Sequence, residues 1–288
     1  MGAKLRVIRR RIRSVQSTKK ITKAMELIAA SRIVRAERRV RQSRPFSDRI
    51  GEVVRDLAAT SERIEHPLLE RREGGATGLI VISADRGLAG AYNANILRTA
   101  ERLRREIGDA RLYVTGRKAI SAFRFRRVEM AEQWTGFSDN PSYEDAAAVA
   151  RRVIDDFSEG QITSARIVYT EFVSMFTQRP AVVEILPVQS EELEGGTELG
   201  PVYEFEPSPE GLLDHLLPLY VQMKVFQAML EAAASEHAAR RRAMSSATDN
   251  ADEMIRHLTR EANSARQQEI TSEIADIVGG AEALRKTV

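Results

Sequence analysis

The chain has 288 residues, 43% of them hydrophobic, and a formal net charge of +3, which is enough material for one large domain or two ordinary ones. The absence of cysteine excludes disulfides, thiol nucleophiles and thiolate metal sites, and no two of the four histidines have the spacing of a metal pair on a helix. No apolar run approaches the roughly 20 residues of a membrane span, and arginines interrupt the N-terminus where a secretory signal would be apolar, so we expect a soluble intracellular protein.

Two stretches, residues 3–44 and 219–278, contain neither glycine nor proline, the residues that most strongly break helices. They predict two very long helices. At a rise of 1.5 Å per residue the second would be about 90 Å long. A compact globule of this size measures only about 50 Å across. We therefore expect part of the helix to extend beyond the globular part.

The positive charge is concentrated at the N-terminus. Residues 1–44 carry 15 Lys and Arg against Glu26 and Glu37, a net charge of +13, so the rest of the chain carries −10. Such an arm suits a nucleic acid, an anionic membrane or an acidic protein surface, and a solvated helix face is the plain alternative. Charge alone leaves these four readings open.

Apolar residues recur at helical spacing in both stretches. The first stripe consists of Ile8, Ile12, Val15 and, after a polar gap, Met25, Ala29, Ile33, Ala36 and Val40. The second consists of Leu219, Met223, Phe226, Leu230, Ala233 and His237, then Met244, Ala247, Ala251, Met254 and Leu258, and after a shift of phase Ile270, Ile274 and Ile277. Sustained heptads predict a coiled coil, in which a polar His237 can fix the register.

The ends of the helices are marked by local signals. Ser208-Pro209-Glu210 is a helix cap followed by proline in the first turn, with a kink expected near Pro218, and Gly279-Gly280 should end or loosen the helix. We expect an N-terminal coiled-coil helix over residues 1–60 that pairs antiparallel with a C-terminal helix over residues 208–288.

Between the two helices, short apolar runs alternate with helical patterns. The expected strands are Leu79–Ser83, Arg111–Thr115, Val128–Trp134, Arg166–Phe172 and Ala181–Leu186, and the expected helices are Asn95–Ile107, Gly116–Phe123 and Ser142–Phe157. A polar loop, Gln189–Pro201, follows. The alternation predicts a Rossmann-like α/β domain over residues 76–190 with a mostly parallel sheet. The fold class is therefore α/β with long helices: an antiparallel coiled coil with an inserted α/β domain.

Candidate sites for chemistry are few. The turn Asp85–Gly90 follows a strand and precedes a helix, where α/β proteins bind phosphate, but it matches neither the dinucleotide fingerprint nor the P-loop. A structural turn is the favoured reading, with a nucleotide site as the alternative. The carboxylate pairs Asp155-Asp156 and Glu191-Glu192 read as solvated surface, and each histidine as a surface or seam residue. No nucleophile, base and orienting group can be assembled, so no cofactor or metal is expected.

Long motifs at both ends resemble the gamma subunit of F-type ATP synthases. The N-terminal motif is Ile12–Leu27 (IRSVQSTKKITKAMEL), and the C-terminal motifs are Ala243–Ala251 (AMSSATDNA) and Asn263–Ile274 (NSARQQEITSEI). The turn Ser83–Asn93 and the segment Val202–Pro207 also fit. The similarity spans almost the whole chain in the right order.

The resemblance implies a non-catalytic rotor shaft of a proton-translocating ATP synthase. In that family the paired terminal helices insert into a hexameric ring of catalytic and non-catalytic subunits that hold the nucleotides, and the globular part contacts the epsilon subunit and the membrane c ring. The implied contacts to the catalytic-subunit ring are Arg266, Gln267, Met25, Lys19, Lys20 and Lys23, and those to the c ring are Tyr203, Glu204 and Phe205. The partner of the basic arm would then be acidic protein, not nucleic acid.

The chain departs from the family at Ala89, where cysteine is frequent, and it lacks the redox-regulatory cysteine insert of the plant chloroplast version, so thiol switching is excluded. The start of the chain shows no transit peptide, which favours a bacterial type, peripheral on the cytoplasmic face of the plasma membrane. Two rivals remain: a nucleic-acid-binding coiled coil using Arg9–Arg13 and Arg38–Arg41, and an α/β enzyme using the Asp85–Gly90 turn.

Overall fold

The computed structural model describes residues 3–60, 66–72, 74–188 and 209–285. The chain forms two compact units, one of Met1–Ile28 with Arg241–Val288 and one of Ala29–Arg240. We call them the paired-helix unit and the sheet unit. The domains expected from the sequence (residues 1–60, 76–190 and 208–288) have boundaries at the ends of the long helices, whereas the two units divide within those helices. The expected boundaries stay predictions.

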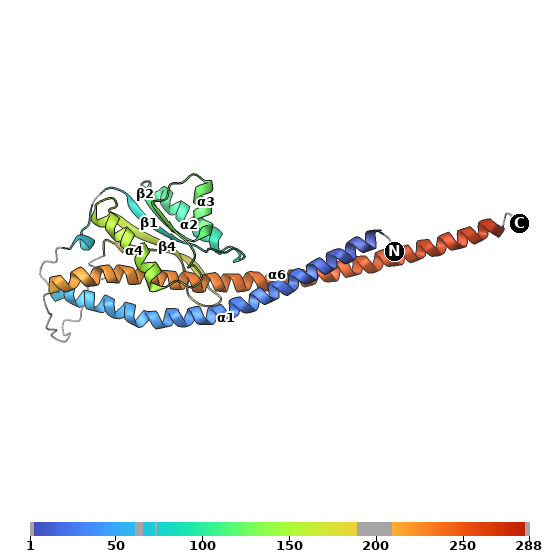
Figure 1. Ribbon diagram of the computed structural model, residues 1–288, viewed down its shortest axis with the longest axis horizontal. Coiled ribbons are helices and arrows are strands. Elements are labelled where there is room, and N and C mark those ends of the chain that lie inside the picture. The colour runs from blue at the N-terminus through green and yellow to red at the C-terminus, as the bar shows by residue number, and fades with distance from the viewer. Residues whose placement is uncertain (1–2, 61–65, 73, 189–208, 286–288) are drawn as a thin grey trace. The chain divides into compact units, whose positions relative to one another are not determined.

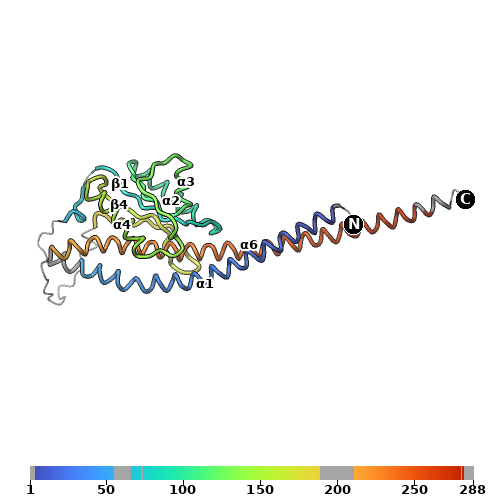
Figure 2. The backbone as a smooth tube through the Cα atoms, in the orientation of Figure 1, coloured from blue at the N-terminus to red at the C-terminus, as the bar shows by residue number. Residues whose placement is uncertain are grey.

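Two helices run through both units (Figure 2). Helix α1 spans Ala3–Thr60 and α6 spans Pro209–Arg285, with 58 and 77 residues, so both long helices are confirmed. Helix α6 also continues through Gly279-Gly280, and the predicted end there is wrong. A glycine costs a helix interior only about 1 kcal/mol and does not block it. The loosening at these glycines and the kink near Pro218 stay predictions.

The sheet unit is built on five strands in the order β3-β2-β1-β4-β5. The strands are β1 (Thr77–Ile82), β2 (Ala110–Thr115), β3 (Glu132–Trp134), β4 (Ser164–Phe172) and β5 (Gln178–Leu186). The first four run parallel and β5 is antiparallel to β4, which confirms the mostly parallel sheet. Strand β3 is shorter than expected because the N–H of Val128 donates to Phe123 O and closes the preceding helix.

Helices cover both faces of this sheet (Figure 1). Helices α2 (Tyr92–Ile107) and α3 (Arg117–Phe125) pack on one face, and α4 (Tyr143–Ser158) and α6 pack on the other. Alternate residues of β1 enter the two cores, Leu79 and Val81 on the α2–α3 side and Ile80 and Ile82 on the α4–α6 side. This three-layer arrangement is the Rossmann-like insert that the alternation of elements predicts.

Helix α4 corrects the reading of Asp155-Asp156 as solvated surface. Asp155 is exposed, but Asp156 is fully buried, because adjacent residues on a helix point in different directions and α4 turns one face to the sheet. The Asp156 carboxylate accepts a hydrogen bond from the Tyr113 hydroxyl and lies 3.0 Å from both Arg111 Nε and Arg152 Nη2. These four side chains form a structural cluster between α4 and the sheet. Burial raises the pKa of the Tyr113 hydroxyl.

The segment Glu231–Ala238 of α6 is buried in all eight positions, so it is not a single heptad stripe. His237 is 2% exposed, and its Nε2 donates to Asp139 O at 3.1 Å, in the loop before α4, rather than to a residue of α1. Burial lowers the pKa of His237 to about 4. The imidazole ring therefore holds α6 against the loop before α4. The prediction that His237 sets the register of a coiled coil did not include this contact.

His66 is likewise neither a plain surface nor a seam residue. Its side chain is 10% exposed and caps the short 3-10 helix η1 (Pro67–Leu69), where Nδ1 accepts from Leu68 N at 3.0 Å. His215 and His257 are exposed, as expected.

Candidate partner-contact surface

The paired-helix unit is an antiparallel helix pair. Leu5 and Ile8 of α1 pack with Leu258 and Ala262 of α6. Further along, Thr22 Oγ1 and Thr248 Oγ1 lie 2.8 Å apart, in hydrogen-bond contact. Residue numbers rise along α1 as those of their partners fall along α6, so the antiparallel pairing predicted from the sequence holds within this unit.

The seam differs in detail from the predicted stripe of α6. Its buried positions include Met244, Thr248 and Ala251, whereas Met254, expected on the stripe, is 52% exposed. Thr248 is tolerated because its hydroxyl also donates to Met244 O at 2.8 Å. Apolar spacing alone did not reveal that a threonine pair would occupy the seam.

The basic residues predicted for the catalytic-subunit ring fall into two groups. Lys19 is drawn into the pair itself, where Nζ lies 2.5 Å from Asp252 Oδ1. Lys20 and Lys23 are exposed, and Lys23 pairs with Glu26 on the same helix at 3.1 Å. Met25 is half-buried. Of these three lysines, Lys20 is the one that is exposed and has no ion pair with another described residue.

Three apolar side chains beside these lysines were missed by sequence reasoning. Ile21, Leu27 and Ile28 are 61%, 60% and 54% exposed. They lie off the predicted stripe, and that is the signal that could have found them, because an apolar residue outside the seam of a helix pair has no partner within the pair. Lys20, Lys23 and Leu27 share one face of α1 at steps of three and four, and Ile21 and Ile28 lie on the neighbouring face. We call these five residues the basic-apolar strip.

The C-terminal part of α6 carries the other predicted contacts. Arg266 and Gln267 are both exposed. One further turn along lies a stripe of exposed apolar residues, Ile270 (44%), Ile274 (56%), Ile277 (72%) and Val278 (58%), which we call the C-terminal apolar stripe.

The expectation that Ile270, Ile274 and Ile277 continue the coiled-coil seam is wrong. Antiparallel pairing brings Leu5 and Ile8, near the start of α1, opposite Leu258 and Ala262 of α6. The described part of α1 begins at Ala3, so it has no residues that could lie opposite Ile270. Exposed apolar stripes of this kind mark surfaces that bind other molecules.

The residues predicted to face the c ring, Tyr203, Glu204 and Phe205, lie outside the described residues, as do Glu191-Glu192. Nothing in the described fold bears on their role.

The Asp85–Gly90 turn is held by hydrogen bonds of its own first residue. The Asp85 carboxylate accepts from the backbone N–H groups of Arg117, Gly136 and Ser138 at 3.1, 2.8 and 3.1 Å. On the other side Gly87 O accepts from Arg240 Nη2 at 3.2 Å. These bonds tie the turn to the start of α3, to the loop before α4 and to α6, which supports the structural reading of this turn.

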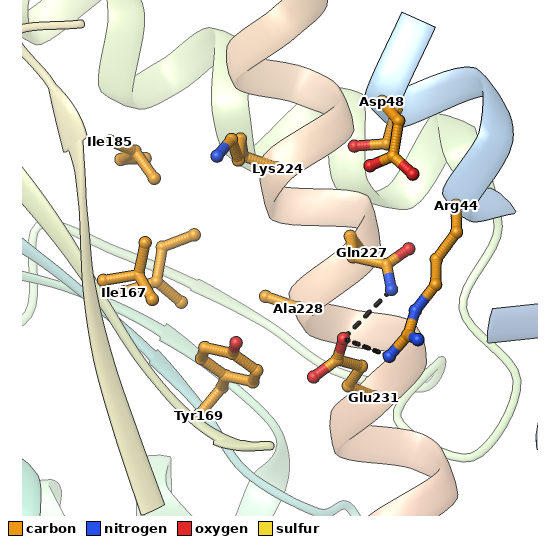
Figure 3. A pocket seen from close by; sticks show the side chains of 11 residues that line it. Arg44, Asp48, Ile167, Tyr169, Ile185, Lys224, Gln227, Ala228 and Glu231 are labelled. Carbon is orange, nitrogen blue, oxygen red and sulfur yellow. Dashed lines mark hydrogen bonds and ion pairs between the residues drawn. The ribbon is translucent and has the colours of Figure 1, made fainter. Parts of the chain in front are cut away.

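A pocket of about 440 Å³ lies in the sheet unit between α1, α6 and strands β4 and β5 (Figure 3). Glu231 Oε1 accepts from Gln227 Nε2 at 3.0 Å and lies 4.0 Å from Arg44 Nη2, while Oε2 has no hydrogen-bond partner among the described residues. Burial raises the pKa of Glu231. Tyr169 and two isoleucines form the opposite wall (Figure 3). Ser47 and Asp48 of α1 and Lys224 of α6 also line the pocket.

No cluster of three or more His, Asp or Glu side chains that could hold a metal occurs within the described ranges. In the same part of the chain, no helix combines the length and the apolar character needed to cross a membrane.

The fold and the surface define a class of protein in which one chain contains an antiparallel helix pair with exposed contact surfaces and a Rossmann-like domain. Comparisons with known proteins identify the family. A family model described as ATP synthase matches residues 4–284. The ATP synthase gamma chains of Kineococcus radiotolerans and Saccharopolyspora erythraea are each 50% identical to this chain, over 99% and 98% of it and 98% of each relative.

Solved structures agree on the fold. A rotor chain of the Euglena gracilis mitochondrial ATP synthase superposes with a TM-score of 0.66 at 18% identity, covering 94% of this chain and 100% of that one. A central stalk chain of the Tetrahymena thermophila enzyme gives 0.62 at 24% identity, covering 79% and 99%. The chain belongs to the ATP synthase gamma chain family. The predictions of a non-catalytic subunit and of the central shaft role are thereby confirmed.

Proposed function

We propose that this chain couples rotation of a membrane c ring to conformational cycling of the catalytic subunits of a proton-translocating ATP synthase, in synthesis or hydrolysis of ATP. The nucleotides are held by a hexameric ring of catalytic and non-catalytic subunits, and the chain supplies the mechanical link. The observation that carries this proposal is the C-terminal apolar stripe of the paired-helix unit, which is exposed along α6 beyond the seam.

Exposed apolar side chains on an otherwise polar helix are stabilised only when another surface covers them. Burial of apolar area contributes about 25 cal/mol per Å². An apolar collar inside the ring of catalytic and non-catalytic subunits would cover Ile270, Ile274 and Ile277. Because such contacts are non-directional, the helix could turn within the collar without breaking a fixed set of hydrogen bonds.

The polar contacts would then depend on the rotational angle of the shaft. The basic-apolar strip on α1 faces an acidic lever segment of a catalytic subunit, with Met25 beside it, and Arg266 and Gln267 meet a catalytic-subunit loop. Lys19 contributes mainly through its ion pair with Asp252, which holds α1 against α6. Coupling follows because each angle of the shaft contacts the open and closed states of a catalytic site with different free energies.

The other partners follow from the same role. Tyr203, Glu204 and Phe205 would meet the polar loops of the c ring, and the Rossmann-like domain would contact the epsilon subunit. The chain would lie on the cytoplasmic face of a bacterial plasma membrane as a peripheral subunit.

Reconstitution tests the proposal directly. The catalytic and non-catalytic subunits are assembled with and without this chain, and ATP hydrolysis and single-molecule rotation are measured. We expect no hydrolysis by the chain alone, and rotation only of complexes that contain it. Coupled turnover that is unchanged when the chain is omitted would refute the proposal.

A further inference from the structure

The sheet unit carries an excess of positive charge in the segment that includes the α2–α3 face of the sheet. Between Tyr92 and Arg127, which spans α2, β2 and α3, ten Lys and Arg stand against only three Asp and Glu, a net charge of +7. The sheet unit, residues 29–240, carries 28 Lys and Arg against 32 Asp and Glu, a net charge of −4, so the rest of that unit has a net charge of −11. No contact proposed above is assigned to a particular residue of this segment.

A groove of about 860 Å³ runs along α2 on this face. Its lining consists of Ala94, Leu97, Arg98, Glu101, Arg102, Arg105, Glu106 and Arg126. Some of these charges are paired: Arg126 Nη1 lies 3.0 Å from Glu101 Oε1, and Arg102 Nε lies 3.8 Å from Glu106 Oε1. Arg98 and Arg105 form no ion pair with any described residue, and both are exposed. The groove therefore combines two apolar residues, Ala94 and Leu97, with two arginines that have no ion pair, although Arg98 Nη1 donates to Asn95 Oδ1 at 3.4 Å.

The end of α3 next to this groove carries a bare aromatic ring. Phe125 is 89% exposed and lies between Arg124, Arg126 and Arg127, all exposed. Burial in another surface would remove about the whole area of a phenyl ring from water, and aromatic and arginine side chains are the types that contribute most to protein interfaces.

The backbone at Arg127 gives an independent sign of function. Helix α3 ends in a Schellman motif, in which Val128 N donates to Phe123 O and Arg127 N donates to Arg124 O, both at 3.0 Å. The motif places Arg127 in the left-handed region at φ +56°, where glycine has the least strain. The chain keeps an exposed arginine there that has no ion pair within the described residues. Strain of this kind gathers at functional sites.

We propose that this surface, formed by the groove along α2 with Arg98 and Arg105 and by Phe125 and Arg127 at the end of α3, docks an acidic amphipathic segment of a partner protein. The partner's carboxylates pair with the arginines that lack an ion pair, and its apolar residues cover Phe125 and Leu97. A protein fits better than a nucleic acid or an anionic membrane, because Glu101 and Glu106 inside the groove would repel a continuous array of phosphates. The inference stands apart from the shaft role.

Site-specific photo-crosslinking tests the proposal in cells that express the full-length chain. A benzophenone amino acid replaces Phe125, and a matched chain carries it at Phe176, which is 80% exposed in the β4–β5 turn. We expect an adduct from position 125, absent from position 176, whose crosslinked peptide comes from a protein segment of net negative charge.

Second variants separate docking from folding. Combining Arg98→Ala with Arg105→Ala should lower the yield of that adduct about threefold to tenfold, as loss of two exposed charge contacts would. The control Arg41→Ala should leave it unchanged. Arg127→Gly should also lower the yield while raising the Tm, by about 2 °C. An adduct to lipid or nucleic acid, an adduct to a neutral or basic segment, no adduct at all, or a yield indifferent to the arginine variants would each overturn the proposal.

Discussion

Helix α6 is buried on all sides over Glu231–Ala238 in the sheet unit, and it is buried along one seam only in the paired-helix unit. In the sheet unit the segment Glu231–Ala238 is buried throughout, although it includes two glutamates, a serine and a histidine. In the paired-helix unit, Ile270, Ile274 and Ile277 stand in solvent. The more polar segment is the buried one.

The difference teaches that neighbours, rather than hydropathy, decide burial along this helix. Each unit's polar residues are satisfied differently. In the sheet unit Ser235 Oγ donates to Thr170 O at 3.1 Å, and Glu236 pairs with Arg240 at 2.5 Å. Buried polar groups are tolerated when they are hydrogen-bonded, so the sheet domain can enclose them. The isoleucines remain exposed because no described element reaches them.

The largest effect should come from removing Arg240. Its side chain is 9% exposed, and it neutralises Glu236, whose side chain is 1% exposed and whose pKa is raised by burial. Arg240→Ala leaves that carboxyl without its partner, and breaking a buried pair costs about 3–5 kcal/mol. The control Arg260→Ala, at an exposed position of α6 in the other unit, should cost less than about 0.5 kcal/mol. Urea denaturation measures both, and equal losses would contradict the comparison.

A smaller, pH-dependent effect should come from His237. Burial holds its pKa at about 4, below the ordinary 6.5, so the folded state keeps the ring neutral while the unfolded state takes up a proton. The charged neighbours are Asp139, Arg240 and Arg32. The stability that the neutral ring confers is present above pH 6.5 and is lost as the pH falls toward 4.

The size of that loss is about 3 kcal/mol, from 1.36 kcal/mol per pKa unit. It should appear as a difference in the free energy of unfolding between the natural chain and His237→Gln, measured by denaturation from pH 7.5 to 4. His257→Gln, at an exposed position of α6, is the matched control. A pH-independent difference at His237 would show that the ring is not kept neutral by burial.

The smallest effect on stability should accompany the largest effect on coupling. Arg266 is exposed, so Arg266→Ala should change the free energy of unfolding by less than about 0.5 kcal/mol. If it contacts a catalytic subunit, torque and coupled ATP synthesis by the reconstituted complex should fall severalfold. Arg260→Ala again serves as the control. A stability loss as large as that of a core truncation would rule out a pure contact role.

Much of the local structure was predictable from the sequence because local signals set it. Ser142 begins α4 as an N-cap with a reciprocal hydrogen bond to Asp145, and the apolar run at Leu79 forms a buried strand, both near the predicted positions. The terminal motifs likewise predicted the family. The burial of Asp156 on α4 was not predictable, because its partners Tyr113 and Arg111 lie on strand β2, more than 40 residues earlier in the chain.

The sequence by itself determined the two long helices, the alternating elements between them and the family, because glycine and proline placement, hydrophobic period and long motifs are properties of contiguous residues. Only the tertiary structure decided which parts of those helices are enclosed. Enclosure depends on residues that are far apart in the chain. His237 is covered by other segments of the sheet unit, such as the loop at Asp139, and the first residues of α1 pack against Leu258 and Ala262, which leaves no described residue of α1 to cover Ile270. The exposed stripe, and the surface at Phe125, are visible only once those neighbours are in place.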